Sequence, residues 1–160
     1  MTTDGFLTCL WFDGQAEEAA AFYVSVFKNS SIGRISHYTD EGPGRTGSVL
    51  TVEFTANGHK FVALNGGPQF TFNEAVSFQI LCADQDEIDY YWTKLTENGG
   101  EGGPCGWLKD RYGLSWQVVY DRLPEILHDP DQEKVARTMK AMLAMGKLDV
   151  AALDKAYAGE

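Results

Sequence analysis

The stretch FLTCLWFDGQAEEAAAFYVSVFK, residues 6–28, contains the pattern from which the fold is predicted. Residues 6–12 are mostly apolar and β-prone, and they stop at Asp13-Gly14, which predicts a strand followed by a turn. Asp13 is then expected to cap a helix running to about Lys28. Small and apolar residues at helical spacing predict one buried face for that helix: Ala16, Ala19, Ala20, Tyr23, Val26 and Phe27.

Three further strands are predicted in the first half of the chain, at residues 32–38, 48–55 and 60–65. In the second of these strands, apolar residues alternate with polar ones, as expected for a strand with one buried face. The dipeptide Asn57-Gly58 is a strong hairpin signal and predicts that the last two strands are paired. The first half therefore has the order β-α-β-β-β.

The same order begins again at residues 76–82. Asp84 and Glu87 fit a capping box for a second helix, which is expected to end near Asn98-Gly99. Residues 107–109 and 114–120 are predicted strands, and the third strand of this half is inferred by analogy with the first half. The repeated order predicts an internal duplication.

The tail has a helical pattern, with helices expected at residues 124–127, 132–145 and 150–158. The middle helix carries an apolar stripe at helical spacing: Val135, Met139, Met142 and Leu143. Such a stripe predicts a packing surface more often than a ligand site.

The composition excludes several classes of function. The 160 residues carry 13 Lys and Arg against 23 Asp and Glu, a net charge of −10, so binding to nucleic acid or to anionic membranes is not expected. No apolar run reaches the length of a membrane span, and residues 1–5 lack the pattern of a secretory signal. Three cysteines without CxxC spacing fit reduced thiols in the cytoplasm.

Several motifs together make the chain resemble the PhnB-like family, whose members often carry the label 3-demethylubiquinone-9 3-methyltransferase, within the vicinal oxygen chelate superfamily of glyoxalase I, extradiol dioxygenases and bleomycin-resistance proteins. The motifs are LWFDGQAEEAAAFY at 10–23, GPQFTFNE at 67–74, IDYYW at 88–92 and CGWLKDRYGLSWQ at 105–117.

The resemblance covers about residues 5–122 and implies an α+β fold. Two β-α-β-β-β modules, at about 5–66 and 75–121, would form cup-shaped mixed sheets, and residues 123–160 would add a helical tail. The methyltransferase label has no support in the residues. The run GGEGG at 99–103 follows a predicted helix, whereas a cofactor loop follows a strand and precedes a helix.

In metal-using relatives the ligands come from the first and last strands of each module. By this resemblance the corresponding residues here are Thr8 and Ala63 in the first module and Ser77 and Gln117 in the second. A shift of one residue would move each side chain to the opposite face. Even so, the neighbouring residues include one thiol, Cys9, and no histidine or carboxylate, so no metal and no other cofactor is expected.

The resemblance then implies a metal-free pocket for a small molecule, lined by neutral polar groups and aromatic rings: Thr8, Trp11, Asn65, Ser77, Trp107 and Gln117. The alternative is an enzyme, with or without a metal. His37, Glu53 and Cys105 are the only candidates for acid, base or nucleophile, and none has a visible partner in the sequence. Relatives commonly pair their modules between chains, so a homodimer with contacts from the tail is also expected.

Overall fold

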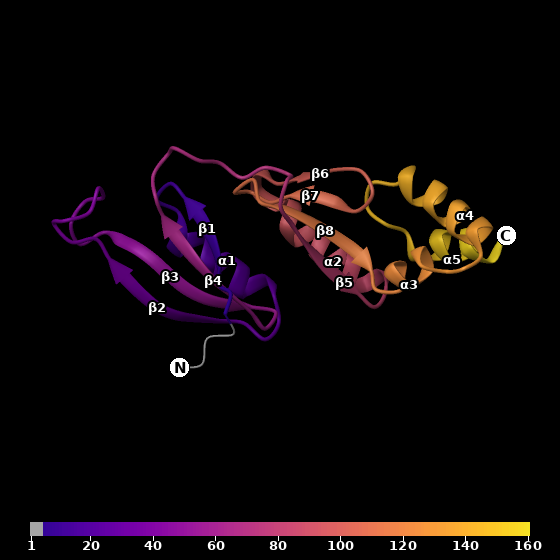
Figure 1. Ribbon diagram of the computed structural model, residues 1–160, viewed down its shortest axis with the longest axis horizontal. Coiled ribbons are helices and arrows are strands. Elements are labelled where there is room, and N and C mark those ends of the chain that lie inside the picture. Colours follow the sequence, from indigo (N-terminus) through magenta and orange to yellow (C-terminus); the bar gives the residue numbers. More distant parts are fainter. Residues whose placement is uncertain (1–4) are drawn as a thin grey trace. The chain divides into compact units, whose positions relative to one another are not determined.

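A computed structural model describes residues 5–160, which form two compact units, one ending at Phe72 and the other running from Asn73 to Glu160 (Figure 1). The first unit contains β1 (Thr8–Phe12), α1 (Ala16–Val26), β2 (Ser31–His37), β3 (Val49–Ala56) and β4 (His59–Asn65). Its sheet has the order β1-β4-β3-β2, with β1 parallel to β4 and the other neighbours antiparallel.

The second unit repeats this plan with β5 (Ser77–Cys82), α2 (Gln85–Thr96), a 3₁₀ turn η1 (Glu97–Gly99), β6 (Glu101–Gly102), β7 (Trp107–Lys109) and β8 (Ser115–Tyr120). The sheet order β5-β8-β7-β6 matches the first unit strand for strand. The α+β fold with two β-α-β-β-β modules is therefore confirmed, including the strand inferred by analogy, which is the two-residue β6.

Local signals account for several turns. Asn57 and Gly58 both have positive φ, 50° and 77°, as a two-residue hairpin between β3 and β4 requires. Asp84 caps α2 by accepting a hydrogen bond from the Glu87 amide at 2.9 Å. The Glu87 carboxylate reaches back to the amide of Ala83, one residue earlier than a standard capping box would predict.

The start of α1 differs from the expectation, because Asp13 does not cap this helix. Gly14 turns the chain with φ 85°, and the helix begins at Ala16 without a cap from its own segment. The Ala16 amide instead donates to Oδ1 of Asn65, at the end of β4, at 2.9 Å. A residue 49 positions away thus satisfies one of the free amides at this helix terminus.

Each helix covers one face of its own sheet. In the first unit, β1 buries Leu10 and Phe12 and β4 buries Phe61 and Ala63, while α1 contributes Ala16, Ala19, Ala20, Tyr23 and Val26. In the second unit, Ile80, Cys82, Trp116 and Val118 are buried on the sheet, with Ile88, Tyr91 and Leu95 on α2. We call the opposite side of each sheet its open face.

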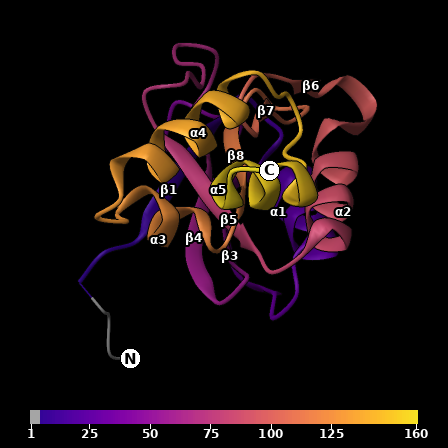
Figure 2. The same ribbon diagram turned by 90° about the vertical axis from the view of Figure 1, so that its right-hand side faces the viewer.

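The tail forms α3 (Leu123–Leu127), α4 (Gln132–Leu143) and α5 (Val150–Ala158), as predicted apart from the ends. Figure 2 shows α4 and α5 side by side, where Arg137 donates to the carbonyls of Ala156 and Tyr157 at 3.0 Å. These helices belong to the second compact unit. A separate tail beginning at residue 123 therefore stays a prediction.

Candidate functional site

The alternation of side chains along the strands decides which predicted site residues lie on an open face. In β1, Thr8 has the same orientation as the buried Leu10 and Phe12. Ala63 and Asn65 likewise share the orientation of the buried Phe61 in β4. The α1 side of the first sheet therefore carries Thr8, Ala63 and Asn65. This corrects the expectation that these side chains line the cup, because the residues next to them along the strands face the other side.

Side-chain contacts agree with this orientation. The Thr8 hydroxyl forms a 3.0 Å hydrogen bond with Nε2 of His59, which has the same strand orientation as Phe61. The Asn65 carboxamide donates to the Val49 carbonyl at 3.1 Å and accepts from Ala16. Both polar ends of Asn65 thus hold main-chain segments together.

The open face of the first sheet carries Cys9 and Trp11 on β1, opposite Val62 and Leu64 on β4. Trp11 is held by the segment after β4: its indole Nε1 donates to the Gly67 carbonyl at 2.8 Å, and Phe70 packs edge-on against its ring at 4.9 Å. The motif GPQFTFNE thereby acquires a structural role, since residues 67–70 secure the Trp11 side chain.

The open face of the second sheet contains the predicted residues Ser77, Trp107 and Gln117. Gln117 stands opposite Gln79 on β5 and Trp107 on β7. Its amide nitrogen donates to Ser77 Oγ at 2.8 Å, and its carbonyl oxygen accepts from Gln79 at 3.3 Å. We call Ser77, Gln79 and Gln117 the amide row.

Two residues that were not predicted as part of the site extend this open face. Ser115 pairs with Ser77 in the strand register, is fully buried, and has no hydrogen-bond partner for its Oγ. Lys109 stands opposite Ser115 on β7 and forms an ion pair with Glu74, which raises the pKa of the lysine. The sequence signal that could have identified both residues is their position along the predicted strands, because it gives them the same orientation as the amide row.

The donor set on the open faces fits a transition metal poorly. Zinc and iron sites need several imidazole, thiolate or carboxylate ligands together. At the end strands these faces offer only one thiol, Cys9, and partial desolvation raises its pKa. Within residues 5–160, no three His, Cys, Asp or Glu side chains lie close enough to hold a metal ion.

The three candidates for acid, base or nucleophile are held by structural contacts or lie at the surface. Glu53 forms a two-point pair with Arg34, at 2.9 and 2.7 Å, and this hydrogen bonding lowers the pKa of the carboxyl, so Glu53 is a weak base. His37 is exposed at the end of β2. Cys105 has a positive φ of 57°, and its amide donates to Met145 of the tail at 2.8 Å.

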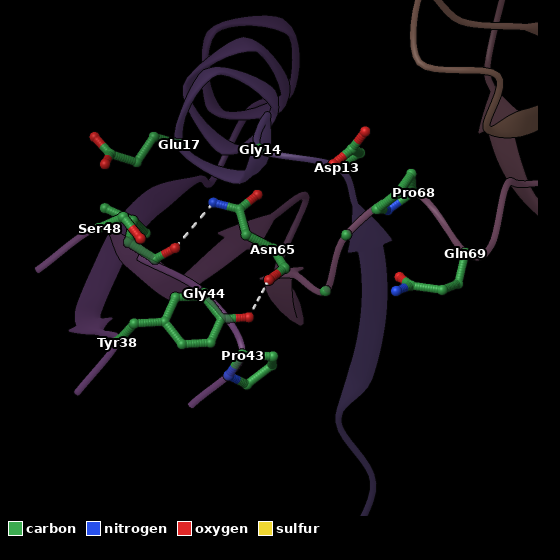
Figure 3. Close-up of a pocket in the computed structure, with 13 residues that line it drawn as sticks. Asp13, Gly14, Glu17, Tyr38, Pro43, Gly44, Ser48, Asn65, Pro68 and Gln69 are labelled. Carbon is green, nitrogen blue, oxygen red and sulfur yellow. Dashed lines mark hydrogen bonds between the residues drawn. The ribbon is translucent and has the colours of Figure 1, made fainter. Parts of the chain in front are cut away.

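A cleft of about 420 Å³ lies at one end of the first unit, and it was not predicted from the sequence (Figure 3). Its walls come from the start of α1, the β2–β3 loop and the segment after β4. Side chains lining it include Asp13, Glu17, Tyr38, Ser48, Asn65 and Gln69. Asn65 is the one predicted site residue that reaches this cleft.

Part of the motif CGWLKDRYGLSWQ forms the turn between β7 and β8. Asp110 is buried, and one carboxylate oxygen accepts from the amides of Tyr112 and Leu114, at 2.9 and 3.1 Å. The other accepts from Nε1 of Trp116 at 2.8 Å. Gly113 supplies a φ of 84° in the same turn. These residues shape the loop that sets Lys109 and Ser115 opposite each other.

Comparisons with known proteins agree with the fold and the motifs. A family profile described as 3-demethylubiquinone-9 3-methyltransferase matches residues 4–119. A PhnB protein from Bacillus cereus with the same description is 37% identical, and the alignment covers 73% of this chain and 99% of that one with a TM-score of 0.64. No curated protein gives a significant match to the sequence.

More distant structures share the fold alone. A protein from Pseudomonas aeruginosa is 16% identical, with a TM-score of 0.56 over 71% of this chain and 95% of that one. The fosfomycin resistance protein FosX from Listeria monocytogenes is 19% identical, with a TM-score of 0.54 over 81% of this chain and 100% of that one. The duplicated β-α-β-β-β modules, the profile match and the Bacillus cereus relative together show that this chain belongs to the PhnB-like family, which carries the description 3-demethylubiquinone-9 3-methyltransferase.

Proposed function

We propose that this protein binds a small uncharged polar molecule on the open face of its second sheet, without a resident metal ion. The observation that carries the proposal is the amide row, in which Ser77, Gln117 and Gln79 are joined by hydrogen bonds on one open face. A carboxamide has two donor hydrogens and two acceptor lone pairs, so each glutamine retains hydrogen-bonding capacity for a ligand.

One neighbour supports a ligand with an apolar part as well as polar groups. The half-buried Trp107 stands beside Gln117 and offers an apolar surface. The Ser115 hydroxyl has the same strand orientation but is fully buried, so it is not exposed to a ligand. Since Lys109 is already paired with Glu74, the face offers no unpaired charge at this position to favour an ionic ligand.

The residues do not support methyl transfer. The glycine-rich run at 99–103 lies between α2 and β7, whereas a nucleotide-binding loop connects a strand to a following helix. The three strand-to-helix turns among the described residues follow β1, β5 and β8, and they carry one glycine, none and none, respectively. The family description is therefore no evidence that this protein transfers a methyl group.

The proposal is tested with benzamide, a neutral aromatic amide, by thermal shift and NMR titration. Benzamide should raise the melting temperature and perturb the amides of residues 77–79 and 115–117. Gln117→Leu should abolish both effects, because it removes the central amide, whereas Gln132→Leu at the exposed start of α4 should leave them unchanged.

Elemental analysis of the purified protein completes the test. Zinc, nickel and iron should all be well below one equivalent. Stoichiometric metal, or benzamide binding that survives Gln117→Leu, would contradict the proposal and favour the alternative of a metal-dependent enzyme of the superfamily.

We also infer that two copies of the chain associate through α4. Two residues of the predicted apolar stripe face solvent, since Met139 is 42% exposed and Leu143 is 63% exposed, whereas Val135 and Met142 are half-buried and Thr138 is fully buried. Light scattering should give about 35 kDa, twice the chain mass. Leu143→Glu should produce monomers, and a wild-type monomer at micromolar concentration would contradict the inference.

A cytoplasmic location is proposed from the cysteines. All three are free: Cys9 is exposed, Cys105 is partly exposed, and burial raises the pKa of Cys82 to about 12. Proteins with several unpaired thiols are typical of reducing compartments. Within residues 5–160, none of the helices combines the length and apolar character of a membrane span. Cell fractionation tests the location directly.

A further inference from the structure

The turn that leads into β7 is held by a segment of the tail, residues 145–148, which we call the strap. The Cys105 amide donates to the Met145 carbonyl, and the Gly106 amide donates to the Gly146 carbonyl, each at 2.8 Å. The family profile ends at residue 119, so the strap lies outside the region that it matches. A segment beyond the family match therefore supports a turn inside it.

This turn has a conformation that its own sequence does not favour. The Trp107 amide donates to the Pro104 carbonyl at 3.0 Å, and the two residues between them, Cys105 and Gly106, have positive φ angles of 57° and 79°. Glycine adopts such angles readily, whereas a cysteine with a positive φ is strained. A strained non-glycine residue persists only when the surrounding structure fixes it, and the two hydrogen bonds to the strap do so here.

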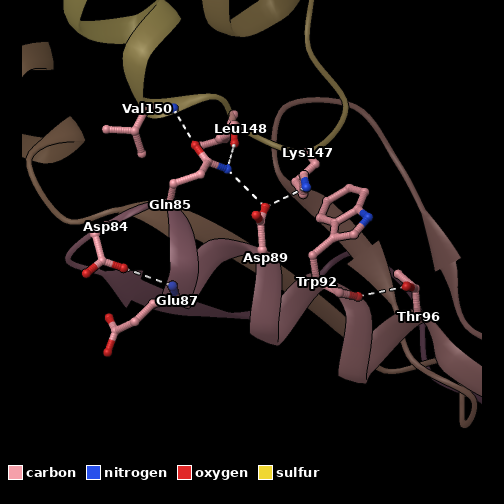
Figure 4. Close-up of polar contacts among 9 residues, drawn as sticks. All are labelled: Asp84, Gln85, Glu87, Asp89, Trp92, Thr96, Lys147, Leu148 and Val150. Carbon is pink, nitrogen blue, oxygen red and sulfur yellow. Dashed lines mark hydrogen bonds and ion pairs between the residues drawn. The ribbon is translucent and has the colours of Figure 1, made fainter.

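The strap is itself fixed to α2, and the turn is packed between the strap and β8 (Figure 4). The Gln85 side chain on α2 donates to the Leu148 carbonyl at 3.0 Å and accepts from the Val150 amide at 2.8 Å. The Leu148 side chain is buried, and a Cβ added to Gly106 would lie 3.2 Å from it. The same Cβ would lie 2.6 Å from the Val118 carbonyl on β8.

The turn also determines where Trp107 lies, because Trp107 follows it directly. Trp107 stands opposite Gln117, the central residue of the amide row. The Gly106 carbonyl accepts from the Val118 amide at 2.8 Å, so the residue next to Gln117 is bonded to the same turn. A change in the turn would therefore move the indole relative to the amide row.

We propose that the strap positions Trp107 for ligand binding, and that it does so through the turn. This inference rests on the proposed function, because it assigns a role within the same ligand site. A ligand that binds only while the strap is closed must stabilise the closed strap as well. Ligand binding should then protect the amides of Cys105 and Gly106, although both donate to the strap and not to the ligand.

Gln85→Ala tests the positioning without any ligand, because it loosens the strap and leaves the turn and the amide row unchanged in sequence. Hydrogen exchange of the two turn amides, Cys105 and Gly106, should become about tenfold faster. The indole NH resonance of Trp107 should shift. Tyr157→Phe is the matched control: it removes a 2.5 Å hydrogen bond to Asp129 elsewhere in the tail, and should change neither readout.

Benzamide then tests the coupling to the ligand site. At about ten times its dissociation constant, it should slow exchange of the two turn amides in the wild type about elevenfold. The Gly159 amide, which is bonded within the last turn of α5, should keep its rate. Turn amides that do not respond to bound benzamide, or equal slowing at Gly159, would overturn the inference and leave the ligand site standing.

The two proposals can fail separately. Absence of benzamide binding to the wild type would refute the ligand site, and Gln85→Ala would still show whether the strap positions Trp107. An unchanged indole resonance and unchanged turn amides in Gln85→Ala would refute the positioning role, whatever benzamide does.

Discussion

The buried carboxylate of Asp110 accepts a hydrogen bond from the indole nitrogen of Trp116 at 2.8 Å, across the turn that joins β7 to β8. The same carboxylate accepts from two amides of this turn. Asp110 therefore holds together the last hairpin of the second sheet and the strand that carries Gln117. Its contacts give it a structural role inside the motif CGWLKDRYGLSWQ.

We expect Asp110→Ala to lower the free energy of unfolding by about 2–4 kcal/mol, because it leaves three donors without their acceptor in a buried turn. Urea unfolding followed by tryptophan fluorescence measures this change. Asp121→Ala, at an exposed aspartate just after β8, should stay within about 0.5 kcal/mol of the wild type. Equal stability of the two variants would contradict the role assigned to Asp110.

Gly66 allows the Trp11 ring to lie against the backbone. A Cβ at position 66 would come within 2.4 Å of the indole, so Gly66→Ala should destabilise the protein by about 1–3 kcal/mol and displace Trp11. Calorimetry gives the stability, and the indole NH resonance reports on the bond to Gly67. Gly146→Ala is the matched control, because its nearest neighbour would be 3.5 Å away. A Gly66→Ala protein as stable as the control would show that the close contact is not retained.

Gln85 anchors the tail to α2 (Figure 4). Its amide nitrogen donates to the Leu148 carbonyl at 3.0 Å, and its carbonyl oxygen accepts from the Val150 amide at 2.8 Å. Gln85→Ala should speed hydrogen exchange of the Val150 amide about tenfold, as the loss of about 1.4 kcal/mol implies. Asp86→Ala, at the exposed neighbouring position, should leave that exchange rate unchanged. If the Val150 rate stays the same in Gln85→Ala, the anchor lies elsewhere.

The ion pair between Asp89 on α2 and Lys147 in the tail should be sensitive to acid. Hydrogen bonds from Lys147 and Gln85 hold the pKa of the Asp89 carboxyl below its ordinary value of 3.8. Because the folded-state pKa is the lower one, the contact is stabilising above pH 3.8 and is lost as the pH falls through the folded value. Carboxyl NMR should show a midpoint below 3.8. Lys147→Met should move that midpoint upward, and an unchanged midpoint would exclude the ion pair with Lys147 (Figure 4).

The sequence alone was sufficient for the order of elements, because those signals act over a few residues. The Asn57-Gly58 pair takes up the two positive φ angles of its hairpin, and Asp84 caps α2, without help from distant segments. Even the short strand β6 followed from the internal repeat, although its local sequence is glycine-rich.

The tertiary structure alone decided which residues face outward from the sheets and what covers them. Residues 6–12 are apolar at nearly every position, so their pattern does not distinguish the two faces, and the pairing with β4 places Thr8 on the α1 side and Trp11 on the open side. Asn65 caps α1 from 49 residues away, and the cleft gathers three segments that are separate in the chain. Contacts of this range leave no periodic signal in the sequence, because they depend on where the folded elements meet.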